Sequence, residues 1–319
     1  MAGKGKKVCR LGVPSTLLCC SAMLAAAQAG PGSADGSFRL KLPVNEVVLT
    51  FHAADAEGLP VNDLKQNEIR LLDNGVSPRR IVAFDLLAGR ALRAGILLDT
   101  SESMRLASSQ SKAIAALFAQ RVFRQNADRA FVTDFGFSSE VAQPWTADAV
   151  LIARGIRNAR QGAMNPLPGT AILDAVFQAC DSQFAQADPA ATGNLILLFS
   201  DGDETAGHTS MEEALKACQR SNTVIDAFRP PSGAGYSTGP KLLAELAGKT
   251  GGRVFMMDDS PDAIDSDLKT IESEARNQYR LVYAPEGLKP DGSFHRIELQ
   301  LPDRVKRFEV RAGYYAPRQ

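Results

Sequence analysis

Five oxygen-bearing side chains in three short segments could together bind a divalent cation. They are Asp99, Ser101, Ser103, Thr170 and Asp201. Carboxylates and hydroxyls are hard oxygen ligands, which suit Mg²⁺ or Ca²⁺ better than Zn²⁺. Two carboxylates and three hydroxyls would leave room for waters or for one outside ligand around a six-coordinate ion. The sequence therefore offers the ligands of an incomplete cation site.

Each carboxylate follows an apolar run that is typical of a strand. Asp99 comes directly after residues 96–98, and Asp201 comes one residue after residues 195–199. Continuous apolar runs are typical of buried parallel strands, and ligands of open α/β sheets lie just beyond the carboxyl ends of such strands. If the two strands are neighbours, Asp99 and Asp201 meet at the topological switch point. Thr170 lies in a Pro-Gly-Thr loop that opens an expected helix, so it can reach in from the adjacent loop.

The segment after Asp99 is also typical of a helix start. Ser101 or Ser103 would then be the N-cap, and Glu102 would lie in a first turn that favours negative charge. Only the addition of Thr170 and Asp201 raises this pattern to the prediction of a metal site.

The composition is that of an ordinary globular protein, with 45% apolar and 23% charged residues. The formal net charge is zero, so bulk charge gives no argument for a nucleic-acid partner. The first 29 residues differ, because four basic residues precede an apolar stretch that ends in Ala27-Gln28-Ala29. This layout predicts a cleaved signal peptide, export to the periplasm or the extracellular space, and no transmembrane span after cleavage. An uncleaved anchor is disfavoured, because Pro14 and polar residues interrupt a segment near the short limit for a span.

Two cysteines, Cys180 and Cys218, remain after removal of the signal. Export permits a disulfide, which would stabilise the chain by roughly 4 kcal/mol in the chain-entropy model. Both cysteines lie on the apolar faces of expected helices, so the sequence favours two buried thiols over a disulfide.

The pattern as a whole predicts an α/β fold, with a doubly wound, mostly parallel sheet inserted in a small all-β, sandwich-like domain. After the signal (1–29) and a leader (30–36), β patterns cover 37–90 and 278–317. Strands and helices alternate over 91–277, with at least five strands. Neither β segment can form a core alone, but together they hold about seven strands, the number of a small sandwich. Two separate β appendages are the alternative.

Local signals predict three further details. Strands 68–72 and 80–84 should form a hairpin around the Asp73-Asn74-Gly75 turn. Ser210 with Glu213 predicts a capping box, and Ser260-Pro261 predicts the start of another helix.

The five oxygen-bearing residues fall, in order and on the right elements, on the positions of a known motif. They resemble the metal-ion-dependent adhesion site (MIDAS) of von Willebrand factor type A (VWFA) domains. Glu102, Pro168 and Ser200 stand where many members have Gly, Gly and Thr, but those positions supply no ligand in the family. The whole chain also resembles a secreted VWFA-related subfamily best known from Acidobacteria, which ends in a segment like 313–317.

The resemblance implies binding rather than catalysis. The cation would be Mg²⁺, with Mn²⁺ or Ca²⁺ as alternatives, and an Asp or Glu of a partner protein would complete its shell. The hydroxyls tend to bind the ion directly, while the carboxylates often act through water. Here Glu102, Asp203 and Glu204 would form an acidic rim, although such residues are ordinarily just solvated. In some members ligand binding shifts the last helix, which corresponds to about 262–276.

Other functions lack a complete residue set. Asp99-Thr100-Ser101 is not the Asp-x-Asp pair of dehalogenase-type phosphatases, and Ser200 lies outside a Gly-x-Ser-x-Gly elbow. The glycines at 233, 235 and 239 have the wrong spacing for a dinucleotide fingerprint, so no dinucleotide cofactor is expected. The three histidines, His52, His208 and His295, are scattered, and only His208 could approach the site. We therefore expect no enzyme, with a metal-dependent hydrolase or a scaffold with an empty site as alternatives.

Overall fold

The computed structural model describes residues 46–124, 126–160, 168–185, 192–231, 238–257 and 260–318. The predicted signal peptide, the leader, the start of the first β segment and the glycines at 233 and 235 lie outside the described residues. The described parts belong to one compact unit, Leu42–Gln319. No helix within these parts has the length and apolar character needed to cross a membrane.

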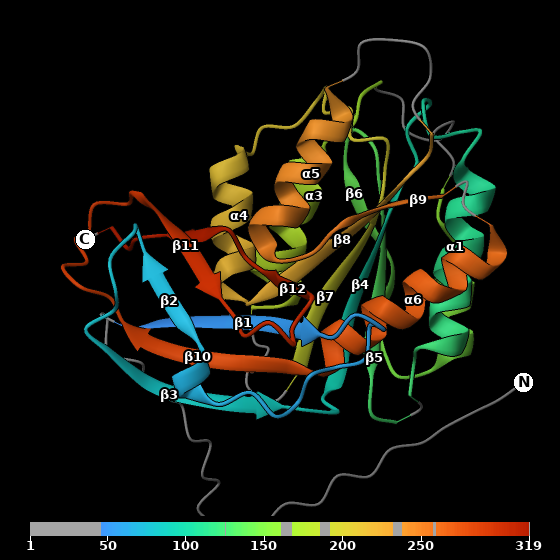
Figure 1. Cartoon of the computed structure of the whole chain (residues 1–319). Coiled ribbons are helices and arrows are strands. Elements are labelled where there is room, and N and C mark those ends of the chain that lie inside the picture. Colours follow the sequence, from blue (N-terminus) through green and yellow to red (C-terminus); the bar gives the residue numbers. More distant parts are fainter. Residues whose placement is uncertain are drawn as a thin grey trace, which may run out of the picture. The chain divides into compact units, whose positions relative to one another are not determined.

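A six-stranded sheet with the order β6-β5-β4-β7-β8-β9 lies at the centre of the α/β part (Figure 1). Its strands are β4 (Ala91–Asp99), β5 (Arg129–Phe135), β6 (Ser139–Thr146), β7 (Thr192–Phe199), β8 (Thr223–Arg229) and β9 (Val254–Met256). Only β6 is antiparallel to its neighbour, and the other pairs are parallel. The predicted doubly wound, mostly parallel sheet is confirmed.

Helices cover both faces of this sheet. They are α1 (Ser108–Arg121), α2 (Ala149–Asn158), α3 (Ile172–Gln178) with its π-helical extension η3 (Ala179–Gln183), α4 (Met211–Arg220), α5 (Gly239–Thr250) and α6 (Pro261–Arg276). Side chains of α1, α2 and α6 pack with Ile96, whereas those of α3, α4 and α5 pack with Leu97. Successive strand residues point to opposite faces, so the apolar runs in the sequence fill two cores.

The predicted helix starts are both confirmed. The Ser210 Oγ accepts a hydrogen bond from the Glu213 amide at 3.2 Å, and Glu213 Oε2 accepts one from the Ser210 amide at 2.9 Å. The Ser260 Oγ accepts a hydrogen bond from the Ala263 amide at 3.3 Å, with Pro261 as the first residue of α6. These side chains satisfy amides that a helix leaves without intrahelical partners.

Seven strands from both ends of the chain form the β part, in two antiparallel sheets with orders β12-β1-β10-β3 and β13-β11-β2. The strands are β1 (Val47–Ala54), β2 (Arg70–Asp73), β3 (Arg80–Leu87), β10 (Gln278–Ala284), β11 (Phe294–Gln300), β12 (Arg307–Val310) and β13 (Gly313–Tyr315); a short 3₁₀ turn, η1 (Gln66–Glu68), precedes β2. Phe51, Tyr279 and Ile297 from both segments share one core. The alternative of two separate appendages is therefore wrong.

The predicted hairpin around Asp73-Asn74-Gly75 is wrong in its pairing. The turn itself forms, because Asp73 and Val76 exchange backbone hydrogen bonds of 2.8 and 3.0 Å. Asn74 and Gly75 have φ of 50° and 78°, the left-handed region that this turn requires. Beyond the turn the strands separate, since β2 pairs with β11 and β3 pairs with β10. Both strands thus pair with partners from the C-terminal segment, which local sequence does not reveal.

The prediction of two buried thiols is also wrong, because Cys180 and Cys218 form a disulfide. Both side chains are buried, as the apolar helix faces indicated. Helices α3 and α4 are neighbours on one sheet face, and the two Cα atoms lie 4.9 Å apart. This separation is within the range that a disulfide spans.

Candidate metal centre

The two strands that carry the candidate carboxylates are adjacent at the centre of the sheet. Strands β4 and β7 are parallel, with Leu98 opposite Phe199. The chain leaves β4 for β5 on one side and leaves β7 for β8 on the other. Asp99 and Asp201 therefore lie at the carboxyl ends of the strands that flank the topological switch point, where α/β sheets bind ligands.

The segment after β4 folds into turns that bring its oxygen atoms together. The Ser101 amide donates to Asp99 Oδ1 at 2.9 Å, and the hydroxyls of Ser101 and Ser103 are 3.1 Å apart. Helix α1 begins only at Ser108, with Ala107 as its N-cap residue. The alternative in which Ser101 or Ser103 caps the helix is therefore wrong, because neither residue is the N-cap of α1.

Ser200 holds the Asp99 carboxylate, a role that the sequence did not predict. Its hydroxyl donates to Asp99 Oδ2 at 2.6 Å and accepts a hydrogen bond from the Gly202 amide at 3.0 Å. Ser200 is fully buried. The one signal in the sequence is a hydroxyl directly after the apolar run of β7, opposite the end of β4.

Asp201 lies in a tight loop. Its Oδ1 accepts a hydrogen bond from the Asp203 amide at 3.1 Å. Gly202 has φ of 88°, and a Cβ atom on it would lie 2.2 Å from the carbonyl oxygen of Gly239. Only glycine fits at this position, because its backbone has a left-handed conformation and packs closely against the start of α5. This packing fixes the backbone that presents Asp201.

Thr170 is buried and lies beside the Asp201 loop. Its amide donates to the Thr205 Oγ1 at 2.9 Å, and its carbonyl accepts the amides of Thr205 and Ala206 at 2.9 and 3.1 Å. The next amide, that of Ala171, donates to the carbonyl of Gly136 at the end of β5, at 2.8 Å. The backbone of the Thr170 loop is thus attached to two loops at the carboxyl end of the sheet.

Asp99 is 2% exposed, and the groups that donate hydrogen bonds to its carboxylate, the Ser200 hydroxyl and the Ser101 amide, carry no charge. Burial, with a contribution from the negative charge of Asp201, raises the pKa of Asp99 to about 6 against the lowering effect of the hydrogen bonds from Ser101 and Ser200. A buried carboxylate next to a second carboxylate favours a cation. The donor set of carboxylates and hydroxyls fits a hard divalent ion. Within the described parts, no group of three or more His, Cys, Asp and Glu is arranged to bind a metal.

The predicted acidic rim is wrong for Glu204. Its Oε2 accepts hydrogen bonds from the amides of Ile172 and Leu173, at 2.6 and 3.2 Å. Glu204 therefore caps α3 from outside, since the N-cap residue Ala171 offers no side-chain hydrogen bond. Asp203 is half-buried and accepts a hydrogen bond from the Gly239 amide at 3.2 Å. Glu102 alone is exposed, in an ion pair of 2.8 Å with Arg105.

The histidines do not converge on this site. His208 is exposed, and its Nδ1 lies 3.6 Å from Asp174 Oδ2. His52 and His295 lie on β1 and β11, in the β part of the chain. The arrangement at Asp99 therefore offers ion ligation, and no histidine base accompanies it among the described residues.

Residues 95–204 match the family of von Willebrand factor type A domains. The chain therefore contains a VWFA domain, which agrees with the sheet order and with the resemblance of the five-residue motif. The match covers β4 to the Asp201 loop, which are the elements that hold the five residues. A search of curated protein sequences finds no match.

Several solved structures are distantly similar. BatB from Bacteroides thetaiotaomicron, described as a conserved hypothetical protein, is 17% identical, with 57% of this chain and 97% of that chain covered and a TM-score of 0.47. A von Willebrand factor type A protein from Catenulispora acidiphila is 14% identical over 85% and 72%, with a TM-score of 0.46. Proximal thread matrix protein 1 from mussel byssus, with a zinc-occupied MIDAS motif, is 15% identical over 63% and 50%, with a TM-score of 0.48. These similarities are too distant to carry an argument.

Proposed function

We propose that the chain is an exported protein-binding module that depends on a divalent cation. Asp99, Ser101, Ser103, Thr170 and Asp201 hold the cation, and an Asp or Glu of a partner protein completes its shell. Mg²⁺ is the proposed ion, with Mn²⁺ or Ca²⁺ as alternatives. The layout of residues 1–29 and the resemblance to a secreted subfamily support export.

The observation that carries this proposal is the buried Asp99 carboxylate at the switch point, with Asp201 as its charged neighbour and neutral donors around it. Burial of a carboxylate is costly unless a charge of opposite sign compensates for it. The paired hydroxyls of Ser101 and Ser103 lie beside it and add neutral oxygen ligands. Where the hydroxyls bind the ion directly and the carboxylates act through water, the bound cation keeps residual positive charge.

That residual charge is the chemistry which the ion supplies when bound, because it attracts a carboxylate. The protein's own residues perform the remaining tasks. Ser200 and the Ser101 amide orient Asp99, and the Gly202 turn presents Asp201. Ser103 is exposed, whereas Asp99 and Ser101 are buried, so a partner can approach the proposed cation site from the side of Ser103.

This proposal is tested by immobilising the folded chain and exposing it to exported proteins of the source cell with Mg²⁺. The expected result is a retained protein that EDTA elutes and that the Asp99→Ala variant does not retain. Glu102→Gln is the matched control, because it removes a neighbouring exposed carboxylate that is not a proposed ligand. A partner that stays bound in EDTA and on Asp99→Ala would contradict the proposal.

A metal-dependent hydrolase and a scaffold with an unoccupied site are the alternatives. A hydrolase predicts metal-dependent turnover of generic phosphate or ester substrates, abolished in Asp99→Ala. A scaffold predicts a partner that binds equally with and without metal. We favour the binding module because no histidine among the described residues accompanies the oxygen ligands.

A further inference from the structure

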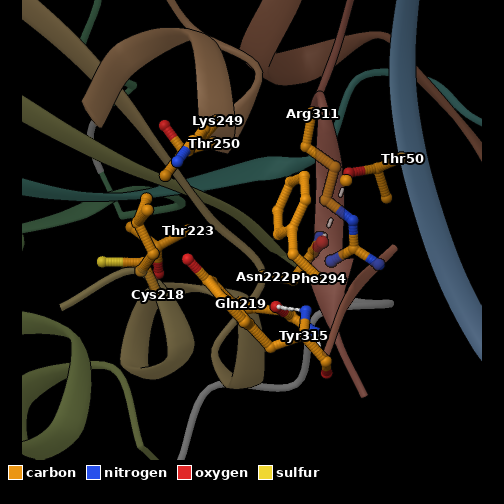
Figure 2. Close-up of a pocket in the computed structure, with 12 residues that line it drawn as sticks. Thr50, Cys218, Gln219, Asn222, Thr223, Lys249, Thr250, Phe294, Arg311 and Tyr315 are labelled. Atoms are coloured by element: carbon orange, nitrogen blue, oxygen red, sulfur yellow. Dashed lines mark hydrogen bonds between the residues drawn. The ribbon is translucent and has the colours of Figure 1, made fainter. Parts of the chain in front are cut away.

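A groove lies between α4 and the last strands of the β part. It opens next to Asn222, which precedes β8, so it lies at the amino end of the central sheet, opposite Asp99. Gln219 links its two walls, since its Oε1 accepts the Tyr315 amide at 3.0 Å and its Nε2 donates to the Tyr315 carbonyl at 3.4 Å. Figure 2 shows the cavity at its inner end, with Gln219 and Tyr315 on one side and Arg311 and Thr50 on the other.

Arg311 lines both the inner cavity and the groove. It is 9% exposed, and its Nη2 donates to the Val48 carbonyl at 2.6 Å. Its guanidinium lies 5.9 Å from the ring centre of Tyr314. The Arg311 Nε is buried without a hydrogen-bond partner in the described structure, where no ion pair joins Arg311 to a carboxylate either.

The other cations of the groove differ from Arg311, because each has a carboxylate neighbour. Lys216 and Arg318 lie beside Glu212, and Arg220 pairs with Asp181 at 2.7 Å. Arg220 and Arg318 are also well exposed, so water solvates their charges. Arg311 is thus a largely buried cation whose hydrogen bond to Val48, within the described part of the chain, uses one of its five N–H donors.

A buried cation without a counter-ion is unfavourable, and desolvation lowers the pKa of Arg311. A carboxylate is the natural partner of a guanidinium, whose planar N–H groups can donate two parallel hydrogen bonds. The wider groove is lined by four cationic residues and one acidic residue, Glu46. Its walls also carry Val47, Leu288 and Tyr315, which suit apolar side chains of a peptide more than a bare inorganic anion.

We propose that this groove is a second binding site, which takes an acidic peptide segment with one carboxylate on Arg311. The site does not use the proposed cation and does not depend on the proposed function. A chain with both sites would hold acidic segments at opposite ends of its central sheet.

The test uses the full chain and a fluorescent five-residue peptide of alternating glutamate and leucine, in EDTA. Its twin with glutamine in place of glutamate is the ligand control. We expect anisotropy to report binding of the glutamate peptide only, unchanged when Mg²⁺ replaces EDTA. Arg311→Gln should weaken binding by at least roughly tenfold, the size expected for a hydrogen bond to a charged group. Arg160→Gln, which alters an exposed cation elsewhere, should leave it unchanged.

If Arg311→Gln perturbs folding, NMR titration of the wild-type chain decides. Amide shifts should then concentrate at Gln219, Asn222 and Tyr315. The proposal is overturned if the glutamate peptide fails to bind, if both peptides bind equally, or if the shifts lie outside the groove. Inorganic phosphate that binds where the peptide does not would overturn the assignment to a carboxylate.

Discussion

Asp99 takes its properties from its immediate neighbours. The Ser200 hydroxyl and the Ser101 amide each bind one of its oxygens, while burial and Asp201 make its charge unfavourable without a cation. The carboxylate is thus oriented before any ion binds. Loss of an orienting hydrogen bond of this kind typically lowers metal affinity by roughly 10- to 100-fold.

Replacing Ser200 with alanine should therefore weaken metal binding by roughly tenfold, although Ser200 is not a proposed ligand. Titration of Mn²⁺ into both proteins would measure the change. Ser210→Ala is the control, because it removes the hydroxyl that caps α4 and should cost about 1 kcal/mol of stability without changing metal affinity. Equal affinities of wild type and Ser200→Ala would refute the orienting role.

A second residue, Asp226 on β8, should make stability depend on pH. Burial raises the pKa of Asp226 to about 7, and the charge of Glu274 adds to the effect. Between about pH 4 and pH 7 the folded state therefore binds more protons than the unfolded state, so stability falls as pH rises. The slope due to this one group approaches about 1.4 kcal/mol per pH unit.

Asp226→Asn should remove that slope, because asparagine carries no charge and its oxygen can still accept the Arg253 amide. Denaturant unfolding at pH 4 and pH 8 measures the effect. We expect the variant to be more stable than wild type at pH 8 and similar at pH 4. A stability difference that is the same at both pH values would show that folding does not shift the pKa of Asp226.

At this scale the sequence predicted where oxygen ligands stand, because alternating Asp and Ser after an apolar run is a local pattern. It did not predict Ser200 as the partner of Asp99, since that contact joins two strands that are distant in sequence. For the same reason Glu204 was assigned to the rim, whereas the fold places it over the start of α3. The residue types were enough to predict a cation site, but the contacts of Ser200 and Glu204 could be seen only in the structure.

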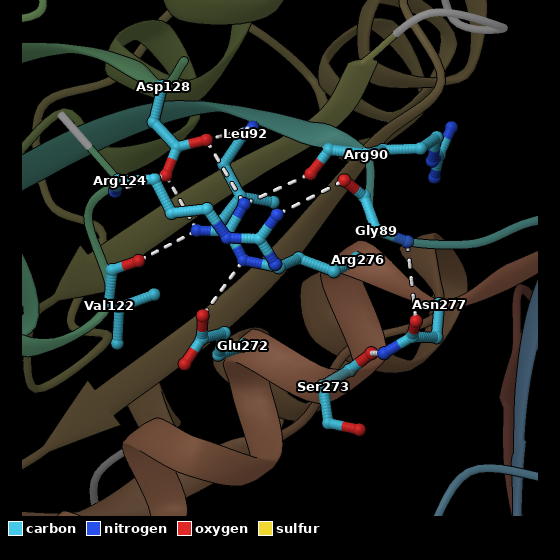
Figure 3. Close-up of polar contacts among 10 residues, drawn as sticks. All are labelled: Gly89, Arg90, Leu92, Val122, Arg124, Asp128, Glu272, Ser273, Arg276 and Asn277. Atoms are coloured by element: carbon cyan, nitrogen blue, oxygen red, sulfur yellow. Dashed lines mark hydrogen bonds and ion pairs between the residues drawn. The ribbon is translucent and has the colours of Figure 1, made fainter. Parts of the chain in front are cut away.

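Helix α6 is anchored at its C-terminal end. Figure 3 shows the Arg276 guanidinium between Asp128 and the carbonyls of Val122 and Arg90. Two hydrogen bonds of 2.6 and 3.0 Å join it to Asp128, and both side chains are almost fully buried. The Nε also bonds Glu272 at 2.9 Å. A rigid shift of α6, which occurs in some VWFA domains on ligand binding, would require breaking these contacts.

Removing the Arg276 charge should be costly. Arg276→Met leaves Asp128 buried without its cation and should lower the free energy of unfolding by about 3–5 kcal/mol. The control is Arg121→Met. It breaks a more exposed ion pair, between Arg121 of α1 and Asp265 of α6, and should cost about 1 kcal/mol or less. Urea unfolding of the three proteins checks this, and equal costs for the two variants would contradict the anchoring role.

The disulfide between Cys180 and Cys218 is the second link between elements, joining the extension of α3 to α4. The Cys180→Ala/Cys218→Ala double variant should lose about 4 kcal/mol of stability in the chain-entropy model. Reduction of the wild-type protein should cause a similar loss. If reduction leaves the unfolding midpoint unchanged, the link contributes nothing to stability.

Element types were the most predictable part of this fold. The cap signals at Ser210 and Ser260 located the starts of α4 and α6, because such signals are local. Pairing was less predictable. The Asp73-Asn74-Gly75 turn formed as its residues required, yet β2 and β3 joined different sheets. Similarly, helix faces predicted that both cysteines are buried, but their 4.9 Å separation depends on how α3 and α4 pack.

At the scale of the whole molecule, the β part depends on both ends of the chain. Strand β10 lies between β1 and β3, so residues that precede the α/β part pair with residues that follow it. The sequence predicted this arrangement from strand count alone, because neither β segment had enough strands for a core. The chain between β3 and β10 is thereby held at both of its ends.

Truncation after Asn277 should therefore unfold the β part rather than trim it. It removes β10 and exposes the edges of β1 and β3, which invites aggregation. Circular dichroism and light scattering would show loss of β signal and association. Removal of residues 318–319 is the control and should leave both unchanged. A monomeric truncated protein with an unaltered melting temperature would contradict the shared sandwich.

Calorimetric titration with Mg²⁺ or Mn²⁺ measures directly whether the five oxygen ligands bind a cation. We predict saturable heat for one ion in the wild type and in Glu102→Gln, and no saturable heat in Asp99→Ala. Thermal unfolding of each variant confirms that it remains folded. Equal heats in wild type and Asp99→Ala, or none in either, would show that these residues do not form a cation site.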